Sequence, residues 1–114
     1  LGNTLIEMQP PFPGARDFYN RHIKEYNEPP VYQVALAYAG GQVLEEAIKR
    51  AGSLDRENVR GELFQLDIIT IIGRFGVDKT GKQMRQHSFI LQWQNGKREI
   101  VWPAGLSTAK PIVK

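Results

Sequence analysis

The sequence contains no cysteine, which excludes disulfide bridges, thiolate metal sites and thiol catalysis. It has no run of about 18 apolar residues, so no segment has the length of a transmembrane helix. The excess of one charge sign is small: 15 Lys and Arg against 12 Asp and Glu give +3, which does not indicate a nucleic-acid partner. What remains, 114 residues of which 41% are hydrophobic, is the composition of at most one ordinary globular domain.

Histidine is rare and forms no catalytic or metal-binding pattern. His22 and His87 lie far apart and lack metal-ligand spacing, and His22 falls within an aromatic stripe that favours a packing role. No serine has a G-x-S-x-G context, and the glycines form no dinucleotide or phosphate-binding motif. The sequence therefore predicts no catalytic residue, no metal site and no cofactor. A small α+β enzyme would need a cleft with perturbed acid–base groups, for which there is no candidate set.

Charge is distributed unevenly along the chain. Residues 1–67 carry seven basic and ten acidic side chains, a net −3, whereas residues 68–114 carry eight basic and two acidic ones, a net +6. Such asymmetry favours two surfaces with different surroundings, and a basic face for an acidic partner is the alternative.

Three helices are expected in the first two thirds of the chain, after an extended arm over residues 1–14. Proline occupies three of the four positions from 10 to 13, which forbids a helix in the arm. Further along, apolar side chains recur at helical spacing. The expected helices cover residues 15–26, 31–51 and 56–65, the last capped by Ser53 or Asp55.

The longest helical segment is predicted to bury one apolar stripe. That stripe consists of Val34, Tyr38, Gly41, Leu44, Ile48 and Ala51. Gly40 and Gly41 each cost a helix about 1 kcal/mol relative to Ala. We therefore expect another backbone to pack closely there, with contact to a ligand as the alternative.

The last third of the sequence is strand-like. Residues 67–72 suit a buried extended segment, and residues 73–77 a short strand followed by a turn. Residues 87–94 and 97–102 flank Asn95-Gly96, a strong hairpin signal. On the first of these strands, alternation places Phe89, Leu91 and Trp93 on one apolar face.

One aromatic residue stands where a ligand could bind. Tyr32 follows two prolines at a helix start, where it could stack on a ligand while free N–H groups attract the ligand's negative end. A tyrosine packed in the core is the other interpretation of the same position.

The order of these segments resembles a known family. The matching stretches are PPFPGARDFYNRHIKEYNEPPVYQVALAYAGGQVLEEAIKRAGSLD, a T-x-x-G-x-x-x-x-D-x-x-G pattern running from Thr70 to Gly81, and the hairpin WQNGK. Together they resemble the C-terminal part of periplasmic solute-binding proteins of branched-chain amino acid ABC transporters, the type I, leucine/isoleucine/valine-binding class.

The resemblance implies an α/β fold of two Rossmann-like lobes, of which this chain would form the C-terminal portion: three helices, a short strand and a β-hairpin. Residues 1–14 would be an arm, 15–66 the helical part of one lobe, 67–87 the segment that crosses the hinge, and 88–114 the hairpin and tail of the other lobe. Strands left without their lobe would be partly exposed. We expect the isolated chain to be a proteolytic product, a swapped dimer, or bound to its missing parts.

The resemblance also implies a non-catalytic ligand site, with Tyr32 lining the pocket and Gln33 as its substitute if the register slips by one. The implied partners are a small amino acid or an aromatic or aliphatic acid, the remaining N-terminal part of the protein and an ABC permease, with no cofactor and no nucleic acid. The implied location is periplasmic or extracellular, at the membrane through the permease. Because most groups that hold the ligand would lie in the remaining part, this chain alone should bind weakly. A regulatory sensor of amides or amino acids with the same fold is the alternative.

Overall fold

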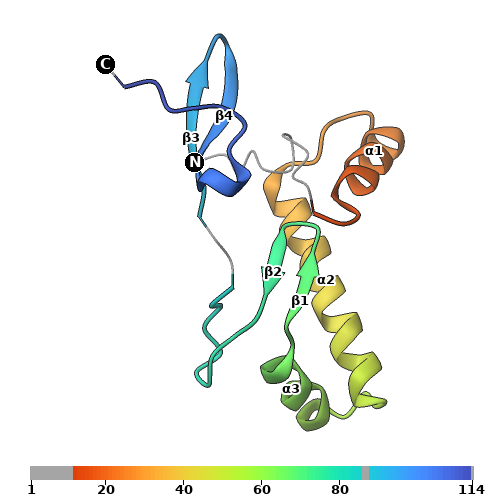
Figure 1. Cartoon of the computed structure of the whole chain (residues 1–114). Coiled ribbons are helices and arrows are strands. Elements are labelled where there is room, and N and C mark those ends of the chain that lie inside the picture. Colours follow the sequence, from red (N-terminus) through yellow and green to blue (C-terminus); the bar gives the residue numbers. More distant parts are fainter. Residues whose placement is uncertain (1–11, 86–87, 114) are drawn as a thin grey trace.

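The computed structural model describes residues 12–85 and 88–113 and shows a mixed α/β chain (Figure 1). Three helices come first, followed by two small antiparallel sheets and a 3-10 turn. The elements are α1 (Ala15–Tyr26), α2 (Tyr32–Ala51), α3 (Arg56–Gln65), β1 (Ile68–Thr70), β2 (Gly73–Phe75), β3 (Ile90–Gln94), β4 (Lys97–Trp102) and η1 (Ala104–Leu106). No described helix combines the length and apolarity needed to cross a bilayer.

The helix boundaries follow local backbone signals. Gly14 takes a left-handed φ of 78° before α1, and Asn27 takes 55° after it, where its N–H donates to Ile23 O at 2.8 Å. Gly52 ends α2 in the same left-handed conformation. The Asp55 carboxylate accepts the Asn58 N–H at 3.1 Å and caps α3. The expected helices at 15–26 and 56–65 are confirmed, and the middle helix begins at residue 32, with Val31 as its N-cap.

The face that α2 buries differs from the expected stripe. Its buried residues are Ala35, Ala39 and Ala47, whereas Tyr38 and Leu44 of the expected stripe are exposed. Alanine wins this face because its small side chain lets the neighbouring elements approach the helix closely. The second expectation for α2 is also wrong within this chain, since a methyl group added at either of its two adjacent glycines would meet nothing within 4 Å.

Two small hydrophobic clusters hold the helices to β1 and β2. The first joins Ala15 and Phe18 of α1 to Ala35 and Ala39 of α2 and to Ile71 in the turn between the strands. The second joins Ala47 of α2 to Val59 of α3 and to Leu66. We call this assembly of residues 12–75 the helical body.

The segment at 67–72 forms only a short strand that turns back on itself. β1 pairs with β2 in the register Ile68↔Phe75 and Thr70↔Gly73, and the turn is fixed where the Ile71 N–H donates to the Gln42 side chain at 3.0 Å. The expectation of a buried run is therefore wrong at Ile69, which is 58% exposed, because α2 covers only one face of this hairpin.

The second hairpin has the expected turn. Asn95 and Gly96 both have positive φ, 51° and 75°, as a two-residue hairpin loop requires. β3 begins at Ile90, three residues later than expected, and His87 lies outside the described residues. Trp93, expected on an apolar packing face, is 69% exposed. We call residues 88–113 the hairpin unit, because β3 and β4 contact each other and η1, and Figure 1 draws them apart from α2 and α3.

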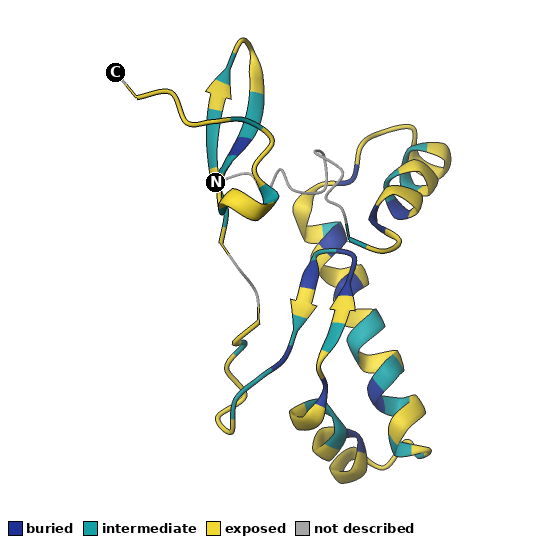
Figure 2. Cartoon of the chain, in the orientation of Figure 1, coloured by how far each residue is buried: buried dark blue, intermediate teal, exposed yellow. Residues whose placement is uncertain are grey.

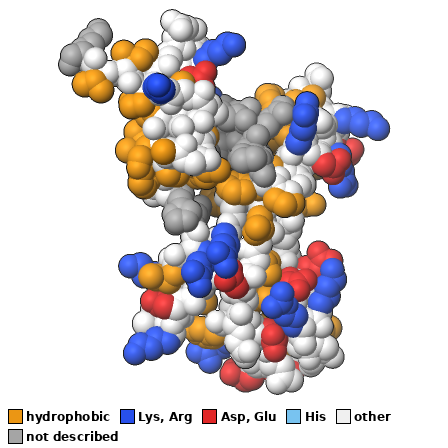
Figure 3. All heavy atoms as spheres, in the orientation of Figure 1, with side chains coloured by type: hydrophobic (Ala, Val, Ile, Leu, Met, Phe, Trp, Pro, Cys, Tyr) orange, Lys and Arg blue, Asp and Glu red, His pale blue; other side chains and the backbone are white. Residues whose placement is uncertain are grey.

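The chain is extended for its length. Its radius of gyration is 16.3 Å, against about 13 Å for a compact domain of this size. Buried residues are scattered along the elements in Figure 2 and form no continuous interior. In the view of Figure 3, charged side chains crowd the end that carries α3, and hydrophobic ones gather toward the end that carries β3 and β4. Much of the apolar surface therefore has no partner within the described chain.

Candidate ligand-binding site

The structure places Tyr32 and Gln33 in the first turn of α2. The preceding Pro30 is fully buried and fixes the entry to the helix, and Val31 is its extended N-cap. The first bond of the turn runs from the Val34 N–H to Val31 O at 3.0 Å. The N–H groups of Tyr32 and Gln33 therefore precede the intrahelical hydrogen bonds and point out of the helix end.

This helix end is not neutralised by its own side chains. Its first turn carries no acidic residue, and Val31 offers no side-chain cap. The helix dipole leaves a partial positive charge at such an end, which favours an anionic group. The Tyr32 ring is 37% exposed, which rules out a tightly packed core position for it within the described chain.

A groove begins one turn beyond Tyr32. It has a volume of about 240 Å³ and lies between α2 and β2, lined among others by Leu36, Gly40, Val43, Ile72 and Phe75. Helical spacing puts Tyr32, Leu36 and Val43 on the same side of α2. The N–H groups of the helix end and an apolar wall thus lie along one side of the helix.

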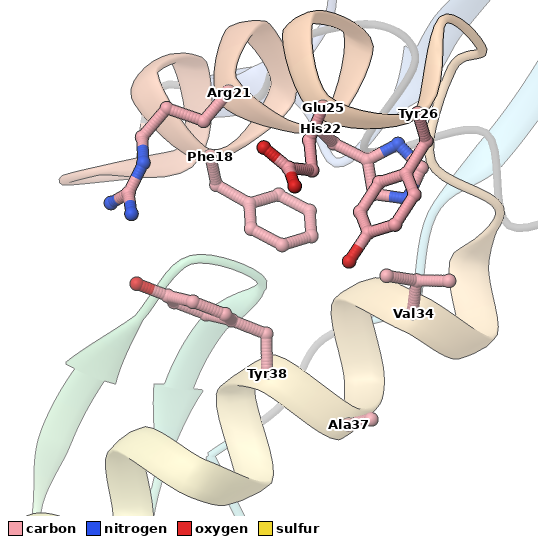
Figure 4. A pocket seen from close by; sticks show the side chains of 8 residues that line it. All are labelled: Phe18, Arg21, His22, Glu25, Tyr26, Val34, Ala37 and Tyr38. Atoms are coloured by element: carbon pink, nitrogen blue, oxygen red, sulfur yellow. The ribbon is translucent and has the colours of Figure 1, made fainter.

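A larger groove, of about 480 Å³, lies between α1 and α2 (Figure 4). Its wall includes Phe18, whose ring centroid is 4.8 Å from that of Tyr38, and His22, whose ring is 4.7 Å from that of Tyr26. His22 Nδ1–H donates to Glu28 O at 2.9 Å, which ties the end of α1 to the loop before α2. This bond gives His22 a structural role. Neither Tyr32 nor Gln33 belongs to the lining of this groove.

Perturbed ionisable groups lie away from the start of α2. The Arg74 guanidinium donates two hydrogen bonds to Asp67, at 2.5 and 2.6 Å, and holds the pKa of that carboxyl below its usual range. Hydrogen bonds from Thr80 likewise lower the pKa of Asp78. Among the described residues no three His, Asp or Glu side chains are grouped so that they could hold a metal ion. The chemistry that the helix end offers is therefore attraction and stacking.

Sequence reasoning missed the glutamine contacts that organise the chain. Gln42 fixes the β1–β2 turn, and Gln92 exchanges two hydrogen bonds with the backbone of Ile112, at 2.7 and 2.8 Å. A glutamine side chain carries both donor and acceptor, so it can replace a backbone amide. The one available signal was the repeat Gln92-x-Gln94, which puts two amides on one face of a strand.

Comparisons with known proteins agree on one family. The family described as periplasmic binding protein matches residues 4–98. The Leu/Ile/Val-binding protein homolog 7 of Brucella abortus is 31% identical over 96 residues, which cover 80% of this chain and 24% of the relative. The homolog of the same name in Brucella suis has the same identity and coverage.

A solved structure gives the same answer for the fold. The crystal structure of the leucine binding protein LivK from Thermotoga maritima matches with a TM-score of 0.62 and 28% identity, over 77% of this chain and 25% of that protein. The chain thus spans about a quarter of the length of these relatives. Its mixed helices and sheets are a portion of the type I periplasmic-binding fold. The chain belongs to the periplasmic binding protein family.

Proposed function

We propose that this chain is the C-terminal part of an extracytoplasmic solute-binding protein. That protein captures a small amino acid or a related carboxylate and delivers it to an ABC permease, without catalysing a reaction. The observation that carries the proposal is the family match over residues 4–98. The leucine-related names of the Brucella and Thermotoga relatives support a branched-chain amino acid as the solute.

The proposed role of Tyr32 is to line the pocket, with Gln33 beside it. Three properties of the α2 end support this role: free N–H groups, no acidic side chain in the first turn, and an aromatic ring that is 37% exposed. A carboxylate would be attracted to the helix end, and an apolar solute side chain would contact the Tyr32 ring. The groups that hold an ammonium and the rest of the solute would come from the remaining N-terminal part of the protein.

The proposed division of the chain assigns residues 15–66 to one lobe, 67–87 to the hinge crossing and 88–114 to the other lobe. The separation of the helical body from the hairpin unit supports it. The large apolar side chains left exposed on α2 and the hairpins support a second part of the protein that covers them, as in a two-lobed trap. Such a protein would work in the periplasm or outside the cell, in contact with the membrane only through its permease.

The test replaces the matching C-terminal quarter of the Thermotoga maritima leucine binding protein with this chain. Calorimetry with leucine, isoleucine and valine should detect binding by the chimera, and far weaker binding or none by the 114-residue chain alone. Tyr32→Ala should weaken leucine binding by the chimera at least tenfold. Tyr26→Ala, which removes an exposed tyrosine on α1, should leave binding unchanged. Tight binding by the chain alone, or equal effects of the two substitutions in a folded chimera, would overturn the proposed site.

A further inference from the structure

The two edges of the β3–β4 hairpin are treated differently. Along β4, the outer edge is closed by the tail of the chain. The Thr108 N–H donates to Ile100 O at 2.8 Å, and the Ile100 N–H donates to Thr108 Oγ1 at 2.9 Å. The Ala109 N–H adds a third bond to Ile100 O at 3.3 Å. The backbone groups that β4 presents away from β3 at Ile100 are thereby satisfied.

The pairing register shows which backbone groups β3 presents outward. Ile100 points its N–H and C=O away from β3, and it lies opposite Leu91. In an antiparallel ladder, residues facing each other in this way form a non-hydrogen-bonded pair, so Leu91 also points its backbone groups outward. Trp93, two residues along the same strand, does the same. No backbone hydrogen bond to these outward groups of Leu91 and Trp93 is formed within residues 12–85 and 88–113.

The side chains of the two strands differ in the same sense. β4 carries three charged residues, Lys97, Arg98 and Glu99, whereas β3 carries neither charge nor proline. Exposed edges in natural sheets are normally guarded by charge, proline or a covering segment. β4 has two of these guards and β3 has none. Trp93 and Ile90 of β3 are in addition 69% and 56% exposed.

We propose that the outer edge of β3 is a strand-docking site whose occupant, in a solution of this chain, is β3 of a second copy. Antiparallel pairing about a two-fold axis at Gln92 overlaps all five residues of each strand. It places Leu91 opposite Trp93 of the second copy, so the outward N–H and C=O groups of each satisfy the other. Because the strand is uncharged, no like-charge contact opposes the pairing. The proposal goes beyond solute binding and does not depend on it.

The absence of cysteine makes a direct test possible. In the proposed dimer, Gln92 faces Gln92 of the second copy in a non-hydrogen-bonded pair, whose Cα atoms lie about 4.5 Å apart. That distance is within the range a disulfide spans. Under mild oxidation, Gln92→Cys should form a cross-linked dimer at least tenfold faster than the control Glu99→Cys, whose residue lies on the guarded strand. Equal rates for the two variants would contradict the proposal.

Sedimentation over a concentration series tests the same contact without cross-linking. The full chain should dimerise, and amide exchange at Leu91 and Trp93 should slow as dimer forms. Trp93→Pro removes one outward N–H that β4 does not use, so the variant should stay monomeric with its hairpin intact, as judged by Trp102 fluorescence. Trp93→Thr keeps the N–H and should still dimerise. A chain that is monomeric throughout, or a Trp93→Pro variant that associates as strongly as the parent, would refute the docking site.

Discussion

The helical body and the hairpin unit are stabilised by different means. In the helical body, side chains from three elements meet around Ile71, which is 1% exposed, and the alanines of α2 allow that contact. In the hairpin unit, Ile100 is the one buried hydrophobic residue among those described. The unit is held instead by its ladder, its tight turn and the glutamine and threonine bonds to the tail. The first region thus contains part of a hydrophobic core, whereas the second depends on directional hydrogen bonds.

The difference can be measured because each region has its own spectroscopic signal. Both tryptophans of the chain, Trp93 and Trp102, lie in the hairpin unit. All three helices lie in the helical body. Tryptophan fluorescence therefore reports on one region and helical circular dichroism on the other.

The largest effect is expected from removing the side chain at the centre of the helical body. Ile71→Ala should lower the free energy of unfolding of this region by about 2–5 kcal/mol, because it leaves a cavity among residues that cannot fully close it. Urea titration followed by helical circular dichroism measures the loss, and the fluorescence transition should stay where it is. Ile112→Ala, at a site 57% exposed, is the control and should change neither signal. A joint shift of both transitions would show that the two regions unfold together.

A second prediction compares the same substitution in the two regions. Gly96→Ala places a side chain at a φ of 75° and should destabilise the hairpin unit by about 1–2 kcal/mol, seen by fluorescence. Gly40→Ala adds a methyl group where nothing lies within 4 Å, in a helix interior. It should stabilise the helical body by up to about 1 kcal/mol. The two Gly→Ala changes should therefore have opposite signs, and the same sign for both would contradict the account of either glycine.

Local signals in the sequence were enough to predict the helices and the Asn95-Gly96 turn. Each depends on groups within a few residues: a left-handed glycine after α2, the Asp55 cap, and two residues with positive φ. The face that α2 buries was not predictable in this way. It depends on which element approaches the helix, and the α1–α2 and α2–β1 contacts favour small side chains over the longer apolar stripe.

The candidate site was predictable only as a position. The double proline before Tyr32 identified a helix start, and the family resemblance gave it a role. The groove beside β2 could not be foreseen, because it arises where a hairpin distant in sequence packs on α2. The tail bonds to Gln92 were also hidden, since a side-chain amide that replaces a strand residue leaves no hydrophobic pattern.

A smaller effect is expected at the cap of α3, which tests whether the second cluster of the helical body is set locally. Asp55→Ala removes the acceptor of the Asn58 N–H and should cost about 1 kcal/mol. Asp17→Asn is the matched control. It loses only a loose, exposed pair with Arg21 at 3.7 Å, and such pairs contribute little. The two variants are compared by urea titration with helical circular dichroism, and equal losses would refute the capping role.

The smallest effect is expected from the ion pair that links the start of β1 to β2. Hydrogen bonds from Arg74 lower the pKa of Asp67 in the folded chain below the value near 3.8 of the free side chain. A carboxyl whose pKa falls on folding stabilises the fold above its unfolded pKa, and this contribution disappears as pH drops through the folded pKa. The helical body should therefore lose a little stability below about pH 4, where Asp67 becomes protonated.

That pH dependence can be assigned by substitution. Asp67→Asn should flatten the acid limb of helical-body stability, measured by urea titration from neutral pH to about pH 2. The hairpin unit should show no matching change, because its one carboxylate, Glu99, bonds to Thr108 in the tail and not to the helical body. The Asp67 carboxyl resonance should titrate below its usual range in the parent and return toward it in Arg74→Ala. An unshifted resonance in the parent would remove the ion pair from the forces that hold β1 to β2.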